Sequence, residues 1–265
     1  MLDALTDRRA ALVIAHPGHE LRVFNWLALA RPTVFVLTDG SGRSGASRLY
    51  QTTRILAAAG ARPGPIYGRF TDAEFYAAIL KRDASCFVKL GAELRDSLQD
   101  KQIDYVVSDA VEGYNPAHDI CHSITSAVVA KLCRSGRCLQ GYEVLLAKAD
   151  RGLEAADTEA ISIKISPAAC AEKLRAAGNY SELASDLCRI VQEEGIDAFN
   201  TESLRPMKPL DFAPLEPVFY ETYGEEQVRR GHYSEVIRYR RHIVPIVEAL
   251  RNFAEGRARE ATCEF

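Results

Sequence analysis

Short, mostly apolar runs alternate with longer segments of helical periodicity through the first half of the chain. Runs of this kind are typical of strands buried on both faces of a parallel sheet. The predicted strands cover 11–15, 33–37, 65–67 and 105–107. The predicted helices cover 21–30, 47–59, 72–81, 85–100 and 119–133. Strands that alternate with helices of these lengths predict an α/β fold, with a parallel sheet covered on both faces.

The second half of the chain is less regular. Two further strands are predicted at 142–146 and 160–165, the second nearer a sheet edge. Helices are predicted at 167–177, 181–194 and 233–255, with a proline-rich loop at 206–217. No internal repeat or low-complexity linker divides the sequence, so we expect a single domain over 1–265. Its core would be 1–140, and 141–265 would add strands and C-terminal helices.

Composition and charge limit the classes of partner. The chain is 47% hydrophobic and 26% charged, as globular proteins are. A formal net charge of −3 gives no reason to expect nucleic acid or an acidic membrane surface as a partner. No apolar run reaches the roughly 18 residues of a membrane helix, and the first residues lack a secretory signal. We therefore expect a cytoplasmic protein that binds neither nucleic acid nor membrane.

Histidines gather where two of the predicted strands end. His16 and His19 follow the first strand, and His118 and His122 follow the strand at 105–107. The carboxyl ends of parallel strands are where α/β proteins bind ligands. Imidazole is a preferred ligand of zinc, and three protein ligands leave the fourth position for water. The sequence thus predicts one zinc, or another first-row divalent ion, bound by His16, His19 and His118, with His122 as a substitute ligand.

Four motifs resemble a known family. Ala15-His-Pro-Gly-His-Glu20 is similar to the Ala-His-Pro-Asp-Asp-Glu signature of the PIG-L/LmbE-like de-N-acetylases. Thr38-Asp-Gly40 ends the second strand as in that family, and Arg48-x-x-Gln51 resembles its Arg-x-x-Glu helix. The segment 112–119, Glu-Gly-Tyr-Asn-Pro-Ala-His-Asp, resembles its His-Pro-Asp-His segment. The resemblance covers residues 10–130 and implies a Rossmann-like three-layer sandwich that holds zinc and removes N-acetyl groups from sugar conjugates.

The resemblance transfers the family's site unevenly. The first zinc-binding histidine falls on His16, the zinc-binding aspartate on His19, and the last ligand on His118. The family's general base falls on Gly18, which has no side chain to accept a proton. Its earlier histidine in the second motif is replaced by Asn115. A missing general base costs about 10² to 10⁴ in rate.

Other residues could complete the site. Asp39 and Asp119 are the favoured replacements for the base, because both lie in loops at strand ends; Glu20 and Asp109 are further candidates. Glu20 is equally suited to orienting a histidine. Tyr114 could donate a hydrogen bond to a developing oxyanion, or could simply pack.

The segment Gly40-Ser-Gly-Arg-Ser-Gly45 fits the dinucleotide pattern Gly-x-Gly-x-x-Gly. It follows the second strand instead of the first, and no acidic residue ends the next strand to hold a ribose. We therefore expect this loop, with Arg43 and Arg48, to bind a polar or phosphorylated substrate. The aromatic and basic stretch 220–242 would be a solvated helix face, or a lid or subunit contact of a homo-oligomer.

The predicted function is a metal-dependent amide hydrolase acting on a small molecule, an N-acetylated sugar or sugar-like conjugate. Two alternatives remain open. The first is a relative of the family that has lost deacetylation and binds a metal or ligand. The second is a nucleotide-dependent enzyme that uses the glycine loop.

Overall fold

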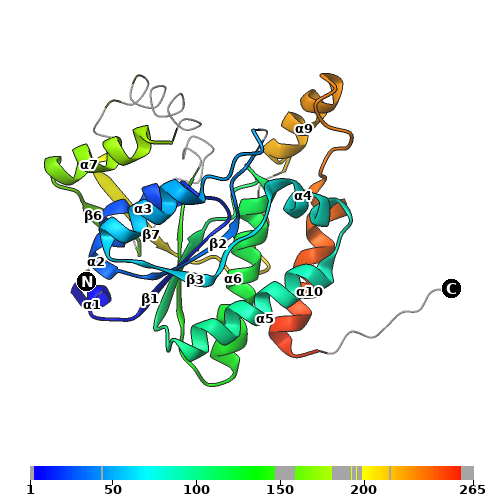
Figure 1. Ribbon diagram of the computed structural model, residues 1–265. Coiled ribbons are helices and arrows are strands. Elements are labelled where there is room, and N and C mark those ends of the chain that lie inside the picture. Colours follow the sequence, from blue (N-terminus) through cyan, green and yellow to red (C-terminus); the bar gives the residue numbers. More distant parts are fainter. Residues whose placement is uncertain are drawn as a thin grey trace.

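A seven-stranded sheet forms the centre of the computed structural model (Figure 1). The structure describes residues 3–42, 44–146, 159–180, 192, 195, 199–214 and 216–257. The strand order is β3-β2-β1-β4-β5-β7-β6. These strands are β1 (Ala10–Ile14), β2 (Thr33–Thr38), β3 (Arg62–Phe70), β4 (Tyr105–Asp109), β5 (Gln140–Val144), β6 (Ile161–Lys164) and β7 (Thr201–Pro206). Strands β1 to β5 pair in parallel, whereas β7 is antiparallel to both β5 and β6.

Helices cover both faces of the sheet (Figure 1), as the sequence predicts. One layer consists of α4 (Asp72–Leu80), α5 (Ala84–Asp100), α6 (Pro116–Arg134) and α10 (Val244–Glu255). The other consists of α1 (Asp3–Thr6), α2 (Phe24–Ala30), α3 (Leu49–Ala59) and α7 (Pro167–Gly178). Strand β1 joins the two cores because its side chains alternate: Ala11 and Val13 pack in the first, Leu12 and Ile14 in the second. The three-layer α/β class is confirmed.

Two parts of the second half differ from the predictions. Strand β7 was not predicted, because its buried positions carry Glu202 as well as Leu204 and so lack an apolar pattern. The Glu202 carboxylate accepts hydrogen bonds from two backbone N–H groups at the start of α2 and from Lys173 Nζ at 3.0 Å. Strand β6, at the sheet edge, agrees with the prediction for 160–165.

The single helix predicted over 233–255 is confirmed only in its C-terminal part, where α10 covers Val244–Glu255. Helix α9 (Phe219–Arg229) ends before Gly231, which adopts a φ of 72°. An irregular stretch follows, then a π-helix (Tyr239–Ile243) that leads into α10. The predicted helix 181–194 lies almost entirely outside the described residues. Among the described residues, no helix is long and apolar enough to cross a membrane.

The strand order places the histidine loops together. The chain proceeds from β1 to β2 and β3 on one side and then returns to β4 on the other side of β1. The carboxyl ends of β1 and β4 therefore flank a topological switch point, where α/β sheets bind ligands. The segment that follows β1 carries His16 and His19, and His118 lies in the first turn of α6, which follows the loop after β4.

Candidate metal centre

The rings of His16, His19 and His118 lie against one another at the switch point. Their centroids are 5.4 Å apart for His16 and His19, 5.4 Å for His16 and His118, and 4.5 Å for His19 and His118. Three imidazoles around a tetrahedral zinc, with nitrogens about 2.1 Å from the ion, would have centroids roughly 5 Å apart. Two distant segments of the chain thus bring together the three residues that the sequence singled out.

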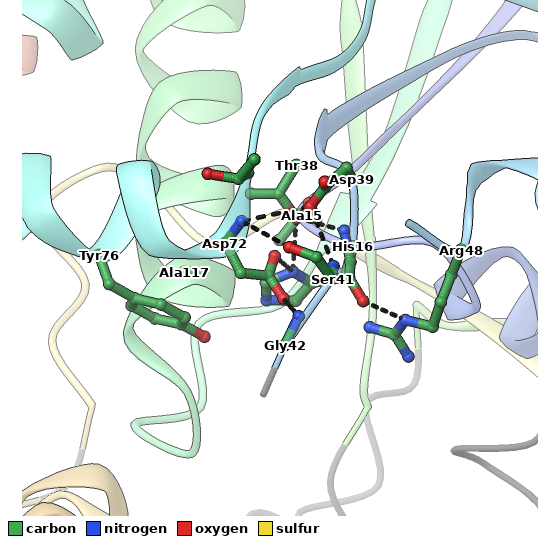
Figure 2. A network of polar contacts seen from close by, with 12 residues as sticks. Ala15, His16, Thr38, Asp39, Ser41, Gly42, Arg48, Asp72, Tyr76 and Ala117 are labelled. Atoms are coloured by element: carbon green, nitrogen blue, oxygen red, sulfur yellow. Dashed lines mark hydrogen bonds and ion pairs between the residues drawn. The ribbon is translucent and has the colours of Figure 1, made fainter. Parts of the chain in front are cut away.

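Two partners hold the Nδ1 atom of His16. It lies 2.7 Å from Thr38 Oγ1 and 3.1 Å from Asp72 Oδ1 (Figure 2). The Thr38 hydroxyl donates to the carbonyl oxygen of Ala15 at 3.0 Å, so it accepts from the imidazole. Nδ1 therefore carries the proton, and in the neutral ring Nε2 has the lone pair. That Nε2 is buried and has no hydrogen-bond partner.

A second carboxylate holds His19 in the same way. The Nδ1 atom of His19 lies 3.0 and 2.9 Å from the two oxygens of Asp109, which also accepts the backbone N–H of Ala15 at 2.8 Å. Burial raises the pKa of Asp109 to about 6, against the opposing effect of His118 and the backbone donor. Burial, reinforced by the neighbouring imidazoles, keeps the pKa of His19 and His118 well below the usual value. Both rings are then neutral at neutral pH, the form that binds metals.

The three imidazoles are side chains that bind divalent metals, but their free ring nitrogens do not point to one common position. His118 is buried, and its Nδ1 has no hydrogen-bond partner, as is also true of His16 Nε2. Buried ring nitrogens without partners are rare in folded proteins, and a bound ion is one of the reasons for them. Even so, no group of three or more His, Cys, Asp or Glu side chains within the described ranges could hold a metal ion as it stands. The imidazoles would have to turn for their free nitrogens to meet at one point.

Two carboxylates were predicted as replacement bases, and each has one oxygen engaged with the backbone. Asp39 Oδ1 accepts the N–H groups of Ser41 at 2.9 Å and Asp72 at 3.3 Å. Asp119 Oδ1 accepts those of Glu112 at 3.0 Å and Gly113 at 3.1 Å. Asp39 is half-buried, whereas Asp119 is only 1% exposed. Burial raises the pKa of Asp119 to about 7, opposed by those two backbone donors. Asp39 is therefore the more accessible of the two to water.

Gly18 has a backbone that disfavours a side chain. Its φ is 107°, in the region that L-residues rarely adopt. Its N–H donates to Glu20 Oε2 at 2.7 Å. The other oxygen of Glu20 accepts from the Tyr180 hydroxyl, which lies 2.8 Å from Thr52 Oγ1. Glu20 is fully buried and fixes the turn between His16 and His19.

The glycine loop is shaped around a carboxylate. The N–H of Gly42 donates to Asp72 Oδ2 at 2.7 Å (Figure 2), so this amide is not directed at a phosphate. Arg48 Nε donates to the carbonyl oxygen of Gly40 at 2.6 Å. A Cβ at Gly40 would lie 2.7 Å from that Nε and 2.8 Å from Pro17 Cδ, so glycine permits this close approach. Arg43 lies outside the described residues.

Tyr114 lies at the rim of the site. Its ring is 45% exposed and lies 6.5 Å from the ring of His118. On the other side it stacks on Phe219 of α9, with centroids 5.0 Å apart and planes at 7°. His122 is also buried, and its Nδ1 lies 3.4 Å from Glu143 Oε2.

Sequence reasoning missed one functional group, Asp72. It is the first residue of α4, behind a capping box formed by Thr71 and Glu74, so its sequence context indicates a helix start. Its contact with His16 joins residues 56 positions apart, and no local spacing signals that contact. Asp109 was named only as a possible base, yet its contacts make it the partner of His19.

Two cavities of about 470 and 630 Å³ lie elsewhere. Their lining includes Gln140 and Thr33, the first residues of β5 and β2, so both open at the amino ends of the strands. Neither includes a histidine of the cluster.

The fold and the site define a mainly parallel α/β protein with a candidate metal centre at the switch point. No protein-family model and no curated protein matches the chain. Among solved structures it is similar to the A40926 pseudoaglycone deacetylase Dbv21, at a TM-score of 0.48 and 17% identity, covering 75% of this chain and 96% of that one. It is also similar to the zinc-inhibited form of teicoplanin deacetylase Orf2, at a TM-score of 0.48 and 13% identity, covering 77% and 100%. Likeness at this level does not assign a function, which has to be argued from the residues of this chain.

Proposed function

We propose that the chain is a metal-dependent amide hydrolase that removes the acetyl group from an N-acetylated sugar or sugar-like conjugate. One observation carries the proposal. Two of three clustered imidazoles are each held at Nδ1 by a buried carboxylate, Asp72 for His16 and Asp109 for His19. A metal-binding histidine typically donates its other N–H to such a carboxylate, which fixes the tautomer and the ring orientation.

The residues that would hold the ion are His16, His19 and His118. Bound there, a zinc or similar ion would polarise the amide carbonyl and lower the pKa of a water molecule. With three neutral imidazoles as its ligands, the ion would retain more positive charge than with a carboxylate among them. Asp72 and Asp109 keep the Nδ1 protons in place, so that each Nε2 presents its lone pair.

The proton of the attacking water needs an acceptor. We assign this role first to Asp39 and second to Asp119. Asp39 follows Thr38, the partner of His16, and its side chain is accessible to solvent. Asp119 has one oxygen buried without a partner, so it accepts a proton only if water reaches it. Tyr114, whose ring lies 6.5 Å from that of His118, would donate to the developing oxyanion. Arg48, with Arg43, would contact the polar part of the substrate.

A ligand-binding protein without hydrolytic activity is the second candidate. One observation favours it: Gly18 has no side chain that could act as a base. The two candidates differ in turnover and share the predicted metal.

Metal content and turnover, measured on the same preparations, test the proposal. We expect about one zinc per chain in the wild type and in His232→Ala, a surface histidine outside the cluster, and none in the double variant His16→Ala/His118→Ala. Zinc should also raise the melting temperature of the wild type but not of the double variant. Release of acetate from N-acetylglucosamine by the zinc-loaded wild type and His232→Ala, but not by the double variant, would support the hydrolase. Full zinc loading of the double variant would refute the site. Zinc binding without turnover on a broad panel of acetylated sugars would favour the ligand-binding alternative.

A further inference from the structure

Four aromatic rings form a continuous wall that starts at the histidine cluster. Beyond His118 come Tyr114, Phe219, Tyr223 and Tyr233, which we call the aromatic wall. Tyr114 and Phe219 stack at 5.0 Å, Phe219 and Tyr223 at 5.9 Å with planes at 25°, and Tyr223 meets Tyr233 edge-on at 6.5 Å. The wall therefore runs outward from the site over the first turns of α9.

The wall is fixed in position by the backbone. Phe219 N–H donates to the carbonyl oxygen of Gly113 at 2.8 Å, which ties the start of α9 to the loop that carries Tyr114. Phe219 and Tyr223 are four residues apart on α9 and so lie on the same face.

The wall concentrates exposed aromatic surface. Tyr114, Tyr223 and Tyr233 are 45%, 41% and 42% exposed. They are three of the five exposed large hydrophobic residues within the described part of the chain; the others are Leu29 and Tyr50. An exposed apolar patch that adjoins a polar site is typical of a ligand-binding surface. Tyrosines supply rigid, amphipathic contact area at a low cost in conformational entropy.

We propose that the aromatic wall binds a second sugar ring of the substrate, beyond the one that carries the scissile acetamide. The inference rests on the proposed function and extends it to a substrate of at least two rings. The wall itself carries no charge, and the glutamates of α9 pair with arginines: Glu221 and Glu225 with Arg238, and Glu226 with Arg230. An uncharged ligand is therefore favoured.

The chemistry of the wall distinguishes a sugar from a hydrocarbon chain. Three of its four rings end in a phenol hydroxyl. A fatty acyl chain lying on them would cover these hydroxyls without offering partners, which costs free energy. A sugar ring presents C–H groups to the aromatic carbons and hydroxyls to the phenols. Because contact with one aromatic ring contributes about 0.5–1.5 kcal/mol, each ring should change affinity by roughly 2- to 10-fold.

Calorimetric binding of three ligands to the zinc-loaded and the metal-free protein tests the inference. The ligands are N-acetylglucosamine, its β-1,4-linked disaccharide and N-octanoylglucosamine. We expect the disaccharide to bind more tightly than the monosaccharide, and Tyr223→Ala to reduce this ratio by roughly 2- to 10-fold. Tyr223→Phe should give an intermediate ratio, since it keeps the ring and loses the hydroxyl. Tyr50→Ala, which removes an exposed tyrosine of α3 outside the wall, should keep the wild-type ratio.

The outcomes separate this inference from the proposed function. If the protein hydrolyses N-acetylglucosamine but the ratio of disaccharide to monosaccharide affinity is the same in the wild type and Tyr223→Ala, the proposed hydrolase is supported and the wall is refuted as a sugar site. If N-octanoylglucosamine binds more tightly than N-acetylglucosamine, and Tyr223→Ala abolishes this difference in affinity, the wall binds an acyl chain and the inference of a sugar site is refuted. Absence of binding for all three ligands would overturn it as well. A disaccharide preference that Tyr223→Ala removes, in a protein without turnover, would support the wall and refute the hydrolase.

Discussion

Replacing Asp109 by Asn should weaken zinc binding without removing any of the three proposed ligands. The wild-type carboxylate accepts from His19 Nδ1 and, at 2.8 Å, from the backbone N–H of Ala15. Asparagine keeps the shape but loses the negative charge, and its NH2 group replaces one of the two oxygens that contact His19 Nδ1. Loss of a carboxylate that orients a metal-binding histidine costs about 10- to 100-fold in metal affinity, or roughly 1.4–2.8 kcal/mol.

Competition with a chromogenic chelator at fixed pH measures this affinity directly. Asp96→Asn, a carboxylate on α5 that pairs with Arg95, serves as the matched control and should bind zinc as the wild type does. Asp109→Asn also loses a charged hydrogen bond to the backbone, worth about 1.5–3 kcal/mol, so the metal-free melting temperature should fall as well. The affinity is therefore compared well below both melting temperatures. Zinc affinity within 2-fold of wild type in folded Asp109→Asn would refute the assignment of His19 as a carboxylate-oriented ligand.

Three further predictions concern the base, the pH and the glycine loop. Asp39→Asn should lower turnover of N-acetylglucosamine by about 10² to 10⁴ with zinc content unchanged. Asp119→Asn should have this effect only if Asp119 is the base. Turnover equal to that of the wild type in both variants would exclude both residues as the base. Burial lowers the pKa of His122 from 6.5 to about 4, so the folded protein loses stability as pH falls from about 6.5 to about 4, by roughly 3 kcal/mol. Urea unfolding of His122→Gln should show a correspondingly flatter pH dependence, and an unchanged profile would contradict this. Gly40→Ala should unfold several degrees below Gly45→Ala in thermal melts. Both glycines have a positive φ (67° and 68°), but only a Cβ at Gly40 would meet other atoms within 4 Å. Equal melting temperatures would rule out the close approach of Arg48 and Pro17 to Gly40.

The sequence predicted the parallel part of the sheet and the histidine cluster for related reasons. Strand β1 is entirely apolar, so both its type and its end could be predicted from the sequence. The end of the strand in turn determines where His16 lies. His118 could be placed because the strand order brings loops after parallel strands to one edge. Strand β7 could not be read, since Glu202 occupies a buried position through its pairing with Lys173. The role of Asp72 could not be predicted either, because its partner His16 is distant in the sequence and only the tertiary structure shows their contact.

The difference between Gly18 and the aspartate of the PIG-L/LmbE-like signature that this sequence resembles is a property of the whole turn and not of one residue. With φ at 107°, the turn directs the Gly18 N–H inward to Glu20, and Glu20 is held in turn by Tyr180, which follows α7. A carboxylate introduced at Gly18 would have to adopt a backbone conformation that costs an L-residue about 1 kcal/mol or more. Restoring the family's base by Gly18→Asp would therefore disturb the geometry between His16 and His19 as it added the acid. Another strand end is a simpler source of a proton acceptor, and the proposal therefore assigns this role to Asp39, which follows β2.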